Sequence, residues 1–256
     1  MRHETKRHET TGRIDLKAPS NWRELTVDQL RIVAEVLRLH FTKEEMLVVL
    51  LCRLTGIRMQ GGASGNGPEV FVTADGQSFT MHDYELADFA SRFEWVFADE
   101  PCDIANPTKA DGHMRGVKFG DWFRADALFH DLAKGRNEDD CNLKDMRQAL
   151  ALLGHKDVSF PNDAVEFDMV LLWWHGVGNM LRVLYPYVFA RSGEPSKGYS
   201  PFKNLQNIHL MLNGGRPQDN EAIDRCDLHD VLSALNHKIE EAEMLKKQLE
   251  KTKSGR

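Results

Sequence analysis

The sequence predicts a mainly α-helical fold, and three observations support this prediction. Two capping boxes, at Thr26–Gln29 and Thr42–Glu45, each mark the start of a helix. Apolar residues recur at helical spacing through most of the chain. Only residues 69–81 combine strand-like residues with a turn dipeptide, Asp75-Gly76, which is typical of a β-hairpin. We therefore expect bundle-like helical domains, one small hairpin and a coiled-coil-like C-terminal helix.

The predicted elements divide the chain into five segments. The first contains "RHET" twice and few apolar residues, which is typical of a disordered arm. The next begins with a helix pair, of which the second helix ends at Gly56. The segments are a disordered arm (1–18), a helix pair with hairpin and helix (19–100), a Pro- and Gly-containing loop (101–118), a helical domain (119–215) and an amphipathic C-terminal helix (221–253). The helix after the hairpin is expected to run continuously through "DYELADFASRFEWVF".

Composition limits the classes of function. A chain of 256 residues can bury a sizeable core, and its net charge of −6 gives no overall attraction for nucleic acid. The four cysteines contain no CxxC pair, which argues against a zinc ribbon and indicates free thiols in a reducing cytoplasm. The N-terminal residues lack the apolar run of a secretory signal. We expect no cofactor and no nucleic-acid partner, and DNA binding through the arm (1–18) is a third, weaker alternative.

The most apolar stretch, residues 169–190, is expected to form a buried helix. His175, Asn179 and Arg182 lie near its middle, where a membrane span would carry a large energetic cost. We interpret His175 as a hydrogen-bonded core histidine. Gly176 and Gly178 weaken a helix unless a neighbouring element packs close against them. The stretch therefore predicts a core helix and no membrane association.

The dipeptide His130-Asp131, in "ALFHDLAKG", matches the central pair of HD-domain phosphohydrolases. Such enzymes hold divalent ions between this pair, an upstream His and a distal Asp, and the ions activate water. The further ligands would have to come from His113 or His82 and from Asp168. A metal-dependent phosphohydrolase is therefore the alternative function.

Helical geometry argues against this metal site. At about 100° per residue, His130 and Asp131 lie roughly 120–140° from the centre of the apolar face of their helix. That face consists of Trp122, Ala125, Leu128, Phe129 and Leu132. We therefore expect the pair to face away from the core, and we assign no metal ligand and no catalytic residue.

The last predicted helix carries an apolar seam with alternating steps of four and three residues, which is typical of a coiled coil. Lys246 interrupts this seam. The predicted partner-binding residues are Leu228, Leu232, Leu235, Ile239 and Leu249. We expect them to contact a protein partner or a second copy of the chain.

The order of four landmarks resembles small helical proteins from the structural and tail gene clusters of tailed phages and prophages. The landmarks are "SNWRELTVDQL", "SFTMHDYELADFASRFEWVF", "FGDWFRADALF" and "LNGGRPQDNEAIDRCDLHDVLSALNHKIEEAE". The resemblance covers about residues 20–245, through packing and capping motifs only. It implies a non-enzymatic, tail-associated or virion-morphogenesis protein that acts through protein contacts. The expected location is the bacterial cytoplasm or the virion.

Overall fold

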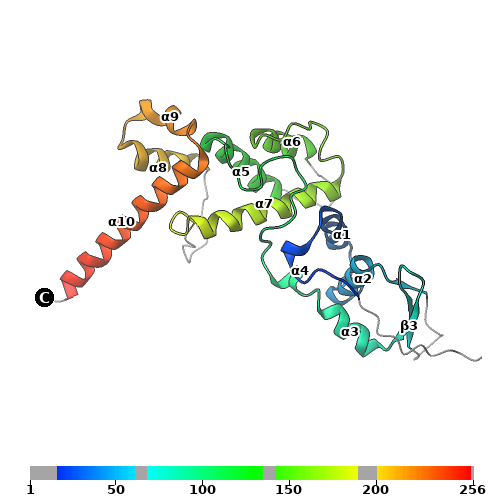
Figure 1. Cartoon of the computed structure of the whole chain (residues 1–256). Coiled ribbons are helices and arrows are strands. Elements are labelled where there is room, and N and C mark those ends of the chain that lie inside the picture. Colours follow the sequence, from blue (N-terminus) through cyan, green and yellow to red (C-terminus); the bar gives the residue numbers. More distant parts are fainter. Residues whose placement is uncertain (1–15, 61–67, 135–141, 190–200, 255–256) are drawn as a thin grey trace, which may run out of the picture. The chain divides into compact units, whose positions relative to one another are not determined.

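The computed structural model describes residues 16–60, 68–134, 142–189 and 201–254, and it confirms the mainly helical fold (Figure 1). Its contacts divide the chain into two compact units. Unit 1 comprises the described residues within 1–20 and 41–93, and unit 2 those within 21–40 and 94–256. Most of the predicted disordered arm, residues 1–15, lies outside the described residues. No described helix is long and apolar enough to cross a membrane.

Unit 1 combines two helices with a small antiparallel sheet. Its elements are α2 (Lys43–Thr55), β1 (Arg58–Met59), β2 (Glu69–Val72), β3 (Ser78–Met81) and α3 (Asp83–Ser91). The predicted hairpin is confirmed, since β2 pairs with β3 from Glu69 opposite Met81 to Val72 opposite Ser78. The sheet also contains β1, which the sequence did not predict and which pairs with β2. The inward side chain of Phe71 is fully buried.

Both predicted capping boxes are present. The Thr26 hydroxyl accepts the backbone N–H of Gln29 at 3.2 Å, and the Gln29 side chain accepts the Thr26 N–H at 2.9 Å. Thr42 and Glu45 exchange the same two bonds at 3.2 and 2.8 Å. Gly56 ends α2 with φ of 75°, a left-handed conformation that glycine adopts without strain. These starts and the stop follow from interactions within one turn of the chain.

Unit 2 contains the long helices. Its elements are a 3₁₀ helix η1 (Trp22–Glu24), α1 (Val27–Leu37), α4 (Trp95–Ala98), α5 (Phe119–Lys134), α6 (Leu143–Leu152), α7 (Ala164–Leu184), α8 (Pro201–Asn213), a 3₁₀ helix η2 (Pro217–Asp219), α9 (Asn220–Asp224) and α10 (Leu228–Ser254). The main helix contacts are α5 with α6, α7 and α9, α1 with α7, and α10 with α5 and α8. Phe119 and Phe129 of α5 are almost completely buried.

The predicted continuous helix over "DYELADFASRFEWVF" is wrong. The helix breaks after Ser91, where the Arg92 N–H turns back to carbonyls two and three residues earlier, and α4 begins at Trp95. The break has a structural reason, because α3 belongs to unit 1 whereas Trp95 packs edge-on against Trp22 in unit 2, at 5.2 Å between ring centroids. Periodicity alone continues across such a break.

The predicted single helix over 221–253 is also divided, into α9 and α10. Residues 225–227 lie between them, and the Asp227 carboxylate accepts the N–H of Gly116 at 3.0 Å and of His229 at 2.9 Å. The bond to His229 satisfies a donor in the first turn of α10. Asp227 thereby starts α10 and ties it to the loop before α5.

The loop at residues 99–118 contributes to the interior of unit 2. Ile104, Ala110, Met114 and Val117 of this loop are buried. The buried side chain of Asn179 in α7 donates a hydrogen bond of 2.6 Å to the Pro101 carbonyl. The contacts of the chain divide it near residues 40–41 and 93–94 instead of at this loop.

Candidate functional site

Of the His130-Asp131 pair, Asp131 faces away from the core as predicted, whereas His130 is half-buried and lines the space between α5 and α7. The apolar face predicted for this helix is buried, apart from Leu128, which is half-buried. The Asp131 side chain is 79% exposed and its Oδ1 lies 3.9 Å from His130 Nδ1. Of the predicted distal ligands, Asp168 pairs with Arg38 at 3.0 Å. In the part of the chain that the structure describes, no three His, Cys, Asp or Glu side chains gather as a metal site would require.

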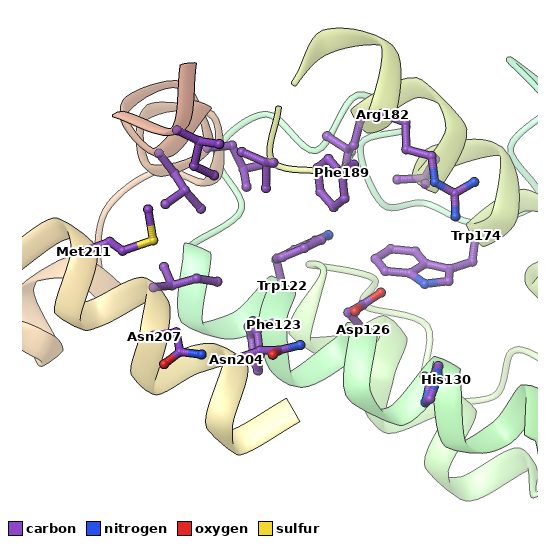
Figure 2. Close-up of a pocket in the computed structure, with 18 residues that line it drawn as sticks. Trp122, Phe123, Asp126, His130, Trp174, Arg182, Phe189, Asn204, Asn207 and Met211 are labelled. Atoms are coloured by element: carbon purple, nitrogen blue, oxygen red, sulfur yellow. The ribbon is translucent and has the colours of Figure 1, made fainter. Parts of the chain in front are cut away.

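A cavity lies directly beside this pair, between α5, α7, α8 and α10 (Figure 2). Its volume is about 550 Å³, within the range of small-molecule sites. The lining residues are Trp122, Phe123, Asp126, His130, Trp174, Val177, Gly178, Leu181, Arg182, Val188, Phe189, Asn204, Asn207, Ile208, Met211, Leu232, Leu235 and Ile239. Most are apolar, and the charged or titratable ones converge on one end.

Asp126 is the most perturbed group of this cavity. Its carboxyl accepts a hydrogen bond from the Trp174 side chain, and burial raises the pKa of Asp126 above its ordinary value. The hydrogen bond and the nearby His130 and Arg182 act in the opposite direction, but burial dominates. A carboxyl with a perturbed pKa in a cavity is a typical feature of a functional site.

Trp174 is held rigidly in this position. Its ring stacks on the buried ring of Phe129, with 4.4 Å between centroids and 22° between planes. The stacking fixes α7 against α5 and points the indole towards Asp126 (Figure 2). Trp122 closes another side of the cavity and meets Phe189 edge-on at 6.4 Å.

A second cavity of about 580 Å³ lies between α1, α5 and α7. It shares five lining residues with the first cavity, namely Asp126, His130, Trp174, Gly178 and Arg182. The two cavities therefore meet at the contact of Asp126 with Trp174.

The two glycines of α7 differ in their surroundings. A Cβ on Gly176 would lie 3.5 Å from the side chain of Ile104, so a neighbouring segment packs close to it, as the sequence suggested. A Cβ on Gly178 would meet no atom of the described chain within 4 Å. Gly178 thus weakens α7 although no neighbouring atom requires a glycine at this position. It lines both cavities. His175 is exposed, so its interpretation as a core histidine is wrong.

The five predicted partner-binding residues fall into two groups along α10. Leu228, Leu232 and Leu235 are buried within unit 2, on the part of α10 that packs against α5 and α8. Ile239 is half-buried at the cavity, whereas Leu249 is 62% exposed. The last turns of α10 extend beyond α8 and α9 (Figure 1).

Among the described residues, the cavity lining includes no Ser, Thr, Cys or Lys side chain. Sequence reasoning found His130 but missed Asp126, which stands four residues earlier and therefore on the same side of the helix. Its isolated position between Ala125 and Ala127 was the available signal.

Comparison with protein-family models, with curated proteins and with solved structures finds no match for this chain.

Proposed function

We propose that this protein is a non-enzymatic assembly protein that binds a protein partner through the end of α10. One observation carries the proposal: Leu245 and Leu249 are 60% and 62% exposed on the part of the helix that extends beyond its neighbours. Their positions are four residues apart, so they occupy one face. Ile239 and Ala242 continue this face towards the body of unit 2. An exposed apolar face on a long helix is typical of an interaction surface.

The resemblance to phage proteins suggests the setting of this interaction. We propose a tail-associated or virion-morphogenesis role, with a protein of the same assembly, or a second copy of this chain, as partner. Glutamates and lysines surround the apolar face, as is usual where one helix pairs with another. The described residues bring no third ligand to His130 and Asp131, so they give the phosphohydrolase alternative no support.

The test places charge on the proposed face and on a neighbouring one. The variant Leu245→Glu/Leu249→Glu should abolish association, since a desolvated carboxylate in an apolar interface is costly. The matched control Met244→Glu/Gln248→Glu adds the same charge on the same turns, about 100° around the helix. Association is measured by sedimentation velocity and by photocrosslinking from position 249 in cells that produce the protein. The proposal fails if the wild-type protein stays monomeric and gives no crosslinked product, or if both variants associate normally.

A further inference from the structure

The cavity of Figure 2 gathers its charged and titratable side chains at one end, and the rest of its wall is mainly apolar, with Asn204 and Asn207 of α8 as further polar side chains. Asp126, His130 and Arg182 come from α5 and α7 at the polar end, whereas Met211 of α8 lies at the opposite side. Aliphatic side chains of α10, including Leu232 and Ile239, complete the apolar wall. A ligand that matches this lining needs a polar head and an apolar body.

A buried donor at this cavity has no acceptor. Trp122 is 6% exposed, and its indole N–H has no hydrogen-bond partner in the part of the chain that the structure describes. Buried polar groups are nearly always paired, because an unpaired donor loses its bonds to water without replacement. The ligand should therefore offer an acceptor near Trp122.

The charges at the polar end favour an anionic head. Arg182 is permanently positive, and it donates to the Asn179 side chain at 2.6 Å and lies 3.9 Å from Glu100. Asp126 is the one acidic side chain among the described lining residues, and burial raises its pKa, which favours the neutral form. Donors therefore outnumber ionised acceptors around this end of the cavity. A carboxylate accepts from guanidinium, imidazole and indole donors alike.

Gly178 keeps the wall of the cavity open. Any side chain at this position of α7 would project into space that the described chain leaves unfilled. Alanine or leucine would stabilise α7 more than glycine does. The sequence therefore has an unfavourable helix residue at the position where a side chain would occupy the cavity. Residues that break a local rule in this way are expected at functional sites.

We propose that the cavity between α5, α7, α8 and α10 binds a small amphipathic carboxylate. Its head would meet Arg182 and the Trp122 indole, and its aliphatic body would lie along α8 and α10. Leu245 and Leu249 are not among the lining residues, and only Ile239 belongs both to the cavity and to the apolar face of α10, so the proposal stands whether or not that face binds a partner.

Three probes of equal chain length test the charge of the head: octanoate below its micelle concentration, octylamine and octanol. Binding is measured by calorimetry and by fluorescence, because Trp122 and Trp174 line the cavity. Octanoate should bind about tenfold more tightly than either other probe, as expected for a charge-assisted hydrogen bond. Arg182→Gln should remove this preference and leave octanol binding unchanged.

Two variants of one position test the location. Gly178→Leu should abolish octanoate binding by filling the cavity, whereas Gly178→Ala, which stiffens α7 to a similar extent, should retain it. The proposal is overturned if wild-type protein does not bind octanoate, if octylamine binds as tightly, or if Gly178→Leu binds octanoate like the wild type.

Discussion

The same substitution, glycine to alanine, should have opposite effects at two helical positions of unit 2. At Gly178 the new Cβ meets nothing within 4 Å, so only the helix propensity changes. Alanine is better than glycine inside a helix by about 0.5–1 kcal/mol, and Gly178 lies well inside α7. We expect Gly178→Ala to raise the free energy of unfolding of unit 2 by that amount.

At Gly120 the surroundings reverse the sign. A Cβ there would lie 2.9 Å from the Asp224 Cβ and 3.3 Å from the Asp224 carbonyl oxygen, and the backbone oxygen cannot move without shifting α9. Overpacking of this kind costs about 1–3 kcal/mol. The Asp224 carboxylate also accepts a hydrogen bond from His209 Nε2 at 2.8 Å, and a displaced carboxylate would lose this bond. Gly120→Ala should therefore destabilise unit 2 by about 1 kcal/mol or more.

Urea denaturation followed by tryptophan fluorescence measures both effects in one assay. All five tryptophans belong to unit 2, so the signal reports the unfolding of that unit. In a thermal scan read by the same fluorescence, a change of 1 kcal/mol would shift the melting temperature by about 2–4 °C for a unit of this size. The reasoning is refuted if Gly178→Ala destabilises the protein, since the space beside Gly178 would then be filled. Stabilisation by Gly120→Ala would refute the close packing of α5 against α9.

Three further changes test the packing, the pH dependence and the local capping. Phe129→Ala should lower the stability by about 3–5 kcal/mol, because it empties a buried site and removes the stacking partner of Trp174; a loss below about 1 kcal/mol in the same urea assay would contradict this. Burial lowers the pKa of His155, whose Nδ1 accepts the Lys109 N–H at 2.9 Å, so the unfolded chain takes up the proton first as the pH falls. The contribution of His155 to stability should be complete above the ordinary pKa of 6.5 and should be lost as the pH falls below it. Between pH 8 and pH 5 the urea midpoint should therefore fall less in His155→Gln than in the wild type, and parallel curves would contradict the role of His155. Thr26→Ala should lower the stability by about 1 kcal/mol, because it removes a capping box. Amide hydrogen exchange in the first turn of α1 should become faster, and unchanged exchange there would contradict this.

Sequence reasoning succeeded where the cause of a structure lies within one turn of the chain. The box at Thr26 and Gln29 needs only residues three positions apart, and the outward orientation of Asp131 follows from helical angles along α5. It failed where the cause is distant. Burial raises the pKa of the Asp126 carboxyl, and its hydrogen-bond donor, Trp174, lies forty-eight positions later in the chain, so no local pattern records that pairing.

The apolar seam of α10 shows a further limit, which bears on both proposals. Its spacing indicates that one face must be covered, but the spacing is the same whether this chain or a partner covers it. The structure separates the two cases along one helix: Leu232 and Leu235 are buried inside unit 2, whereas Leu249 is exposed. Ile239 stands at the transition, since it lines the cavity and continues the exposed face. A ligand in the cavity and a partner on the helix end would thus contact neighbouring turns of one rigid element, so binding of octanoate should be compared with and without the partner surface intact. If the Leu245→Glu/Leu249→Glu variant binds octanoate like the wild type, the two sites act independently; weaker binding would show that they are coupled, with Ile239 as the residue they share.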